Sequence, residues 1–477
     1  MNAGGLKKLA THSAVYGAAD VFQGAVNFLL LPVYTAFLSP TDLGNLALLL
    51  LFGTLAKIVF RLGLDSGFFR THYDQETPES RQALAGTVCA FAGVVGAVLL
   101  LSTAFLAPVL TRVLFGHDEG APVRWVVLVA ADVAVGTLAF VPLALLRIEE
   151  QPVRFSIYSG VRHALNIVLK VVLLWRGLGV DGALWADLVS TAVFVVALLP
   201  LLRGRARFPW RSDLLRDALR FGLPKVPHGL MVQAQNLADR KILDLFVTRA
   251  EVGIYSFGYT FGAGVKFALS AFEPAWGPFV YSRVREPGAP RVLARTATYA
   301  FAGFAGLALA VALLAPEAVT LMTPRRPELR AATPLVPVVA LAYLLHGVFL
   351  LTSIGIGIDR RARYYPLITA VAAAVNIGAN FAWIPRPSSR GAAWATVASY
   401  AVMATLGAAV SRRLYAIPFE ASRMSAIALL AGLAFACGRW APASLWTAIA
   451  WKAVPLAAFA GAAYAIASRP RRDEQEA

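Results

Sequence analysis

The chain has 477 residues, of which 58% are hydrophobic and only 15% are charged, whereas soluble domains carry about 25% charged residues. This composition excludes a soluble globular domain and predicts a polytopic membrane protein, and the formal net charge of +17 indicates attraction to anionic lipid headgroups rather than binding of nucleic acid. The two cysteines, Cys89 and Cys437, both lie in apolar stretches, which excludes a disulfide framework and a zinc or redox CxxC site.

Apolar segments recur along the whole chain, each long enough to cross a hydrocarbon core of about 30 Å. They predict an all-α polytopic membrane protein with about 14 transmembrane helices. The expected spans are 13–36, 42–67, 83–107, 122–146, 155–176, 181–202, 222–247, 251–274, 292–314, 333–358, 363–385, 391–411, 424–441 and 446–467.

Two stretches of the chain resemble each other at an offset of 209 residues, with a one-residue slip in the middle. The matched pairs are Asn27 with Asn236, Gly44 with Gly253, Phe52 with Phe261, Gly53 with Gly262, Lys57 with Lys266, Asn166 with Asn376, Trp185 with Trp394, and Ser190 with Ser399. Such a repeat predicts a duplicated half-transporter, and six spans in each copy give the copies the same orientation in the membrane.

The repeat also predicts the domain boundaries. We expect a six-helix bundle at 1–202, a basic cytoplasmic linker at 203–221, a second six-helix bundle at 222–412, two extra helices at 413–467 and a charged tail at 468–477. The linker is amphipathic, with Phe208 and Trp210 in its middle. It fits either a helix on the inner leaflet whose arginines face phosphates or a plain loop that sets the topology.

The orientation follows from the arginines, because cytoplasmic loops keep an excess of basic residues. With the N-terminus inside, the loops at 203–216, 283–291, 360–363 and 412–413 and the tail at 469–472 are cytoplasmic and arginine-rich. The first span has no small-residue cleavage site before it and is expected to be retained. Both termini are therefore predicted to be cytoplasmic.

Ionisable residues inside a span are costly in hydrocarbon and usually face a polar cavity or a partner. Lys57, Arg61 and Asp65 are spaced by four residues, which places them on one helical face. At about 1.5 Å per residue, Lys57 lies roughly 24 Å from the start of its span. Snorkelling to the headgroups is the alternative for Arg61 and Asp65.

The repeat places Lys266 at the same depth, in a stripe with Tyr255, Tyr259 and Glu273. Two ammonium groups that face each other are tolerable only with water or an anion between them. We therefore expect a site for a negatively charged ligand. Packing inside the protein is the alternative role for the two tyrosines.

Other polar residues line the first and seventh expected spans. Asp20 and Asn27 lie in the first span, and the seventh carries Gln235, Asn236, Asp239 and Arg240. Four charged residues approach the outer boundary, where intrahelical pairing of Asp with Arg or gate closure explains them as well as substrate contact does: Asp239, Arg240, Lys241 and Asp244. Lys170 and Lys452 have no lysine counterpart in the repeat, so snorkelling or a bond to a neighbouring helix is expected for both.

No catalytic set is present in the sequence. It has no Ser/His/Asp spacing, no Walker motif and no His/Glu metal cluster. We therefore expect a protein that is not an enzyme and that needs neither a metal nor a cofactor.

Several segments resemble the Wzx-type polysaccharide flippases of the multidrug, oligosaccharidyl-lipid and polysaccharide exporter superfamily. These segments are LLLPVYTAFLSPTDLGNLALL from Leu29, GLDSGFFRTHYD from Gly63, FGLPKVPHGL from Phe221, NLADRKILDLF from Asn236, EVGIYSFGY from Glu251 and AFEPAWGPFVYSRV from Ala271. The resemblance covers the first twelve spans. It implies two six-helix bundles around a cavity lined by spans one, two, seven and eight, with a lipid groove formed by the last two helices.

The resemblance also implies a function, which is to move an undecaprenyl-diphosphate-linked oligosaccharide to the outer leaflet by alternating access. Lys57, Lys266 and Arg61 would hold the diphosphate, while Asp20, Asn27, Gln235, Asn236, Tyr255 and Tyr259 would line the path of the glycan. Asp239, Arg240 and Glu273 would serve in gating.

Two alternatives stay open. One is the flippase for the peptidoglycan lipid precursor. The other is a cation-coupled multidrug exporter of the same superfamily, which would use buried carboxylates such as Asp20, Asp132 and Asp187.

The expected location is the bacterial cytoplasmic membrane. The expected partners are the lipid-linked oligosaccharide, membrane lipids and the machinery of polymerisation and chain-length control. A monomer is the default.

Overall fold

The computed structural model describes residues 28, 30–116, 121–207, 210–359, 361, 363–385, 389–442 and 444–469. Asp20, Asn27 and most of the first expected span lie outside these residues. The regular elements of the described residues are all helices. By their contacts they form two compact units, Met1–Gly253 and Ile254–Ala477, and each is considered by itself.

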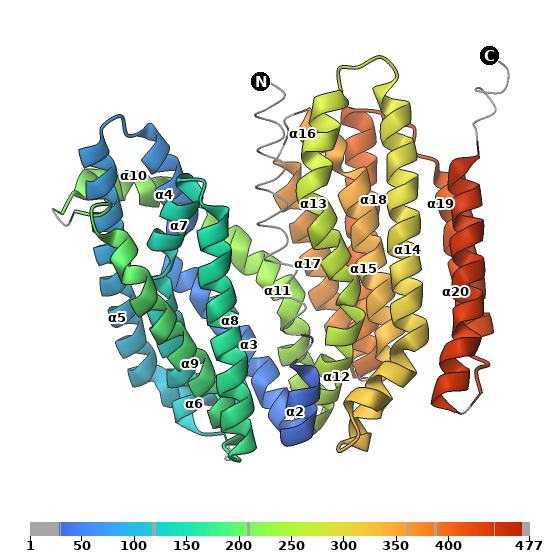
Figure 1. Cartoon of the computed structure of the whole chain (residues 1–477), viewed down its shortest axis with the longest axis horizontal. Helices are drawn as coiled ribbons and strands as arrows, with labels where there is room; N and C mark the ends of the chain where they lie inside the picture. Colours follow the sequence, from blue (N-terminus) through green and yellow to red (C-terminus); the bar gives the residue numbers. More distant parts are fainter. Residues whose placement is uncertain are drawn as a thin grey trace. The chain divides into compact units, whose positions relative to one another are not determined.

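The first unit contains both short and long helices (Figure 1). They are α2 (Leu31–Phe37), α3 (Pro40–Arg61), α4 (Leu64–Asp74), α5 (Pro78–Phe115), α6 (Val123–Thr137), α7 (Phe140–Ile148), α8 (Pro152–Trp175), α9 (Gly179–Leu198), the 3₁₀ helix η1 (Leu199–Leu202), α10 (Ser212–Gly222), α11 (Lys225–Asp244) and the first turn of α12 (Arg249–Gly262).

The second unit contains the rest of α12 and the following helices. They are α13 (Gly264–Arg283), α14 (Ala289–Met322), the 3₁₀ helix η2 (Pro327–Ala332), α15 (Leu335–Thr352), α16 (Ile354–Ile358), α17 (Tyr364–Trp383), α18 (Ser389–Leu414), α19 (Ala421–Gly438) and α20 (Leu445–Ser468). The division by contacts falls inside α12, whereas the repeat places the second bundle at 222–412. The repeat-based boundaries stay a prediction.

Eleven helical stretches in the described chain are long and apolar enough to cross a membrane, which confirms the expected all-α polytopic membrane fold. The count of about 14 spans is not confirmed. The expected seventh and eighth spans correspond to α11 and to α12 with α13, which are helical but not among the eleven. The helix α11 is not among the eleven because it is too highly charged. Its 20 residues include Lys225, Asp239, Arg240, Lys241 and Asp244.

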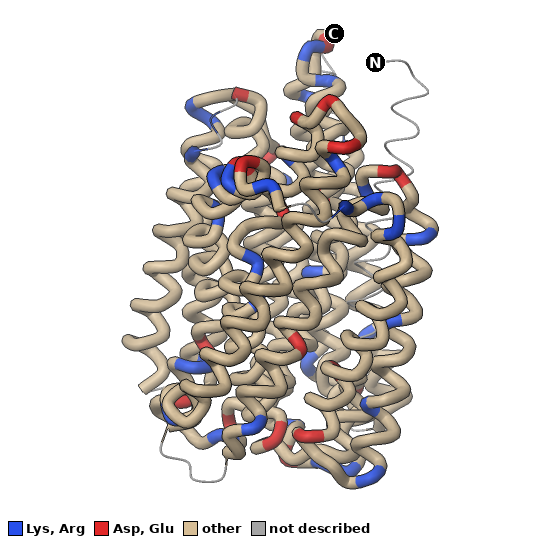
Figure 2. Tube along the Cα trace, turned by 90° about the vertical axis from the view of Figure 1, so that its left-hand side faces the viewer, with Lys and Arg blue, Asp and Glu red and all other residues tan. Residues whose placement is uncertain are grey.

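Charged residues follow the pattern expected of membrane helices. Figure 2 shows Lys, Arg, Asp and Glu mostly towards the ends of the helices, with few along their middle. The few charges in the middle of the helices therefore need a partner or a polar surrounding.

The second expected span is interrupted. A capping box of Ser39 and Asp42 starts α3, because each side chain satisfies the free backbone N–H of the other. The helix ends at Arg61, and Leu62 and Gly63 follow with φ angles of 49° and 70° before α4 begins. The break places Lys57 and Arg61 on α3 and Asp65 on α4, whereas the sequence predicted one continuous helix.

The linker forms one short helix, α10. Its buried residues Leu214, Leu215 and Ala218 share a core with Phe68 of α4 and Leu84 of α5. The most deeply buried stripe of α10 is therefore covered by protein, which differs from a helix that rests its apolar face on the leaflet. Trp210 is exposed, and Phe208 lies outside the described residues.

The first turn of α12 crosses α3 at two glycines. A Cβ built on Gly44 would overlap the carbonyl oxygen of Arg249, and one built on Gly253 would overlap that of Pro40. Gly44 and Gly253 are 209 residues apart, and so are Pro40 and Arg249. The same contact is thus made twice with the partners exchanged, as across a twofold axis.

We predict that Gly253→Val lowers the thermal stability of the purified protein. A branched side chain cannot fit against the Pro40 carbonyl, and overpacking of this kind costs about 1–3 kcal/mol or more. The matched control is Gly378→Val in α17, where a Cβ meets nothing within 4 Å. Equal melting temperatures of the two variants would contradict the role of this crossing.

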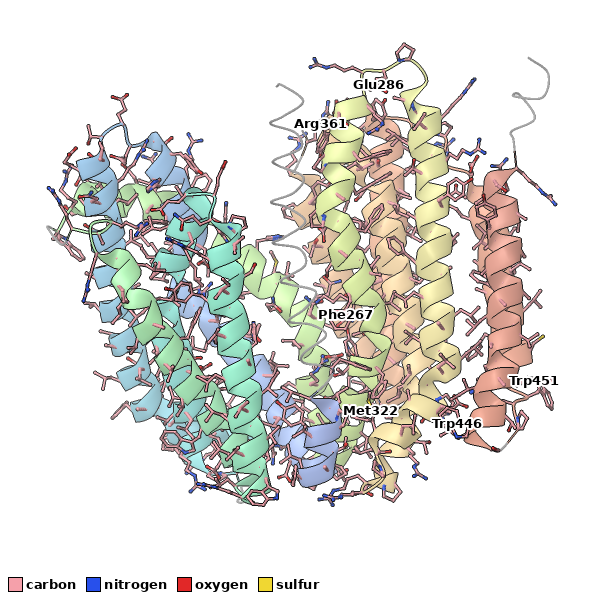
Figure 3. The ribbon with its side chains drawn as sticks, viewed as in Figure 1. Phe267, Glu286, Met322, Arg361, Trp446 and Trp451 are labelled. Carbon is pink, nitrogen blue, oxygen red and sulfur yellow. The ribbon has the colours of Figure 1, made fainter. Side chains whose placement is uncertain are left out.

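In the second unit, the hairpin of α19 and α20 docks on α14. The Nζ of Lys452 lies 2.6 and 2.7 Å from the two carboxylate oxygens of Glu317, and both side chains are buried. Trp446 and Trp451 lie at the end of the hairpin away from the C-terminus (Figure 3), and they are 77% and 49% exposed. The expected interhelical bond of Lys452 is confirmed.

We predict that Glu317→Gln destabilises the protein by roughly 3–5 kcal/mol, because it leaves the Lys452 ammonium buried without a counter-charge. The double variant Glu317→Leu with Lys452→Met should recover most of this loss, since it removes both charges. Thermal unfolding in detergent measures both. A double variant no more stable than the single one would show that the pair is not what holds the hairpin.

Candidate substrate-binding site

Lys57 lies on an exposed side of α3, one turn before the break. Arg61 follows it, and its Nη1 donates to both carboxylate oxygens of Asp65 at 3.1 and 3.0 Å. This pair joins the end of α3 to the start of α4, so the break does not separate the two charges. Lys57 has no ion pair within the described part of the unit.

A second polar group connects α8 with α9. The Nζ of Lys170 lies 2.8 Å from Oδ1 of Asp187 and 5.8 Å from the centre of the Tyr34 ring. The Nδ2 of Asn166 donates to the same Asp187 oxygen and to Oγ of Ser190, both at 2.9 Å. Lys170 is buried. The expected interhelical bond of Lys170 is therefore confirmed, and snorkelling is not observed.

Arg162 and Asp132 connect this group to Lys57. The Nη2 of Arg162 donates to Oγ1 of Thr191 at 3.0 Å, and Asp132 of α6 interacts electrostatically with Arg162. The Oδ1 of Asp132 is buried and has no hydrogen-bond partner among the described residues. Arg162 and Asp132 both act electrostatically on Lys57. Charged groups of α3, α6, α8 and α9 thus form one connected set.

Arg162 was not predicted from the sequence as a site residue. Asp132 and Asp187 were predicted only for the alternative function of a multidrug exporter. A signal was present, because Arg162, Asn166 and Lys170 recur every fourth residue in an otherwise apolar span. Such a stripe predicts one polar helical face. Their partners on α6 and α9 became visible only in the folded unit.

The corresponding positions of the second unit are uncharged. Asn376 and Asn380 stand 210 residues after Asn166 and Lys170, and Nδ2 of Asn380 donates to Oδ1 of Asn376 at 3.0 Å. Thr396 stands 209 residues after Asp187. The ion pair that joins α8 and α9 in the first copy therefore corresponds to two uncharged residues, Asn380 and Thr396, in the second.

Lys266 lies on α13, and its side chain is exposed, as is that of Lys57. Phe267, the next residue, lies well inside the length of the unit rather than at its ends (Figure 3). His346 of α15 is close enough for Lys266 to act on it electrostatically. The structure thus places the lysine partway along the helices. Whether the two repeat-related lysines face each other stays a prediction.

The two tyrosines of the expected stripe are packed in the protein. Tyr255 is 0% exposed and Tyr259 is 6% exposed. The hydroxyl of Tyr259 lies 3.3 Å from that of Tyr343, and the Tyr343 ring lies 5.8 Å from that of Tyr400. The packing role weighed for them in the sequence is the one observed in this conformation. Contact with a glycan would require these rings to leave their neighbours.

The expected residues of α11 are mostly buried. Gln235 is buried and Asn236 is half-buried. The Nη1 of Arg240 lies 2.8 Å from Oδ1 of Asp239 and donates to the Asn236 carbonyl at 2.9 Å. This is the intrahelical pairing that the sequence left open beside a gating role. Glu273, the third expected gating residue, is exposed on α13.

The end of α11 is held by a separate network that the sequence did not predict. Asp244 pairs with Lys241 at 3.1 Å and with Arg249 at 2.6 Å. Lys241 donates to the Leu114 carbonyl at 2.8 Å, and Arg249 donates to the Phe115 carbonyl at 3.0 Å. These bonds satisfy carbonyls at the C-terminal end of α5 that have no helical partner. They fix the loop between α11 and α12 to α5.

The set in the first unit has one surplus positive charge. Lys57, Arg61, Arg162 and Lys170 carry four positive charges, and Asp65, Asp132 and Asp187 carry three negative ones. Lys170 and Arg61 have paired carboxylates, so the surplus lies at Lys57 and Arg162. Such a surplus attracts an anion.

A family model described as "Polysaccharide biosynthesis protein" matches residues 33–276, a range that includes both Lys57 and Lys266. A search of curated proteins gave no match.

Several solved structures have the same fold. The lipid II flippase MurJ in an inward closed conformation aligns over 95% of this chain and 99% of its own, with a TM-score of 0.78 and 12% identity. An inward-facing multidrug resistance MATE family transporter of the MOP superfamily aligns over 84% of this chain and 95% of its own, with a TM-score of 0.61 and 18% identity.

The family match covers more than half of the chain, and the two structures have the fold that the sequence resemblance implied. They confirm the expected resemblance to the flippases of the multidrug, oligosaccharidyl-lipid and polysaccharide exporter superfamily. The chain belongs to the polysaccharide biosynthesis protein family.

Proposed function

We propose that this protein translocates a polyprenyl-diphosphate-linked oligosaccharide from the inner to the outer leaflet of the bacterial cytoplasmic membrane, for assembly of a surface polysaccharide. It works by alternating access and catalyses no reaction. The observation that carries the proposal is the pair of repeat-related lysines. Lys57 is exposed on its helix and forms no ion pair with a described residue, and Lys266 is exposed at the repeat-related position.

The chemistry of this substrate matches such a pair. A diphosphate is anionic and a glycan is hydrophilic, so neither enters hydrocarbon without polar groups around it. The polyprenyl tail is apolar and stays in the lipid. A transporter for this molecule therefore needs cations that are not neutralised by the protein's own carboxylates, which is the state of Lys57.

In this proposal Lys57, Arg61 and Lys266 hold the diphosphate, and Arg162 keeps a positive potential around Lys57. Asn236 and Gln235 remain candidates for contact with glycan hydroxyls, as do Asp20 and Asn27 beyond the described residues. Tyr255 and Tyr259 support the second unit from inside. Glu273 stays a candidate gating residue because it is exposed.

The peptidoglycan lipid precursor is the second candidate substrate, and the shared fold with the lipid II flippase MurJ favours it. It has the same diphosphate and polyprenyl chemistry, so the lysines do not distinguish the two. The two candidates are distinguished by the lipid-linked intermediate that accumulates in a strain from which this protein is deleted. A surface-polymer intermediate supports the proposal, and a peptidoglycan intermediate supports the second candidate.

A cation-coupled multidrug exporter is less well supported. Of the carboxylates that it would recruit, Asp187 is already neutralised by Lys170 at 2.8 Å, and Asp132 lies near the cations Lys57 and Arg162. A cationic drug would meet a net positive charge here.

The topology, with both termini in the cytoplasm, belongs to the proposal. So do its partners, which are membrane lipids and the machinery of polymerisation and chain-length control.

We predict that replacing Lys57 and Lys266 together by Gln abolishes export of the polymer at normal protein level. A hydrogen bond to a charged group contributes about 1.5–3 kcal/mol, so each lysine lost should weaken substrate binding about tenfold or more. Surface polymer and membrane protein are both quantified. Lys57→Arg with Lys266→Arg should keep much of the export, because the charges remain.

The matched control is Lys225→Gln, which removes an exposed lysine at the start of α11. It should leave export unchanged. Normal export by the Lys57→Gln, Lys266→Gln protein would rule out the proposed role of the lysine pair.

We predict a different result for Lys170. Lys170→Gln leaves Asp187 unpaired and should destabilise the protein by roughly 3–5 kcal/mol. Adding Asp187→Asn should restore most of the stability, because it removes the unpaired charge and because the corresponding residues of the second unit, Asn380 and Thr396, are uncharged. Thermal unfolding and export are measured for both variants. If the double variant is stable but does not export, the ion pair itself is needed for transport.

A further inference from the structure

A groove runs along one side of α10, the helix of the basic linker. Its volume is about 680 Å³, and its lining consists of Ser212, Leu215, Arg216, Leu219, Arg220, Leu223 and Pro224. The leucines recur every four residues, as do the two arginines. On a helix this spacing places an apolar row beside a basic row along the same direction.

The two arginines of the groove are not neutralised by the protein. Neither Arg216 nor Arg220 forms an ion pair with a described residue. Arg211, at the start of the same segment, differs because it pairs with Asp213 at 2.7 Å. Arg211 lowers the pKa of the Asp213 carboxyl to about 2 through a side-chain hydrogen bond, so this pair is charged but internally balanced at neutral pH.

The opposite side of α10 is fixed to the protein. A Cβ on Gly222 would overlap the carbonyl oxygen of Gly63, and one on Gly67 would overlap that of Ala218, so α10 and α4 are in backbone contact. Beyond this contact lies a second cavity, where Arg220 is accompanied by Asp74 and Asp217. The groove itself contains no acidic residue. It is therefore a positively charged, apolar surface on a helix that cannot easily move away.

We propose that this groove binds an anionic phospholipid of the leaflet in which α10 lies. The guanidinium groups of Arg216 and Arg220 receive the phosphate, and one acyl chain runs along Leu219 and Leu223. Guanidinium groups fit phosphate oxygens in pairs of parallel hydrogen bonds. These two leucines are about 6 Å apart along the helix at 1.5 Å per residue, which accommodates part of one chain.

The lining favours a phospholipid over the glycan-bearing lipid. Among the described residues that line the groove, Ser212 is the only polar side chain besides the two arginines. A glycan needs several hydroxyl and amide partners, whereas a small anionic headgroup needs the two arginines alone. The proposal requires only that the protein lies in a membrane, so it is independent of what the protein transports.

The experiment is native mass spectrometry of the delipidated protein titrated with phosphatidylglycerol, and with phosphatidylcholine of the same acyl chains. We expect one phosphatidylglycerol to bind more tightly than the others, and phosphatidylcholine to show no such event. In Arg216→Gln with Arg220→Gln this first event should be at least about tenfold weaker. Leu219→Asn should weaken it as well, because it places an amide in the apolar row.

The matched control is Arg203→Gln with Arg211→Gln, which removes two arginines of the same linker from outside the groove. It should leave the first binding event unchanged. An equal loss in both double variants would overturn the proposal in favour of unspecific attraction to the basic linker. Displacement of the bound phosphatidylglycerol by an equal concentration of a polyprenyl diphosphate would also overturn it and assign the groove to that lipid.

Discussion

The cost of an unpaired charge away from water is the constraint on which this structure depends. In the described chain, each buried Lys, Arg, Asp or Glu lies within ion-pair distance of an opposite charge: Lys170 with Asp187, Arg240 with Asp239, Lys452 with Glu317, and Glu420 with Arg423. These pairs join helices or stabilise one helix, so they serve the fold. Lys57 lies outside such pairs, and it is therefore the residue on which we base the proposed binding of an anion.

The two copies of the repeat share some positions and differ at others. The copies keep a lysine at equivalent positions 57 and 266, and they keep the reciprocal glycine contact of Gly44 and Gly253. The copies differ at another pair of positions, because Lys170 and Asp187 of the first unit correspond to Asn380 and Thr396 of the second. The net charge at these positions is the same in both copies, because the ion pair of Lys170 and Asp187 is replaced by two uncharged residues.

Much of the fold and part of the candidate site could be predicted from the sequence. Hydropathy and the 209-residue repeat predict the helical membrane fold and the equivalence of the two lysines, because both depend on patterns along the chain. The break at Leu62 and Gly63 and the burial of Tyr255 and Tyr259 could not be predicted in this way. A left-handed residue and a packed ring depend on neighbours that are distant in sequence.

The sequence by itself determined the family, the helical membrane class and the position of the repeated lysines, since composition and periodicity are local properties. Only the tertiary structure decided which charges are neutralised. Lys170 and Lys452 resemble Lys57 in the sequence, yet helix packing brings a carboxylate to each of the first two and no described ion-pair partner to the third. The physical reason is that the state of a charge in a membrane is set by what lies within about 4 Å of it.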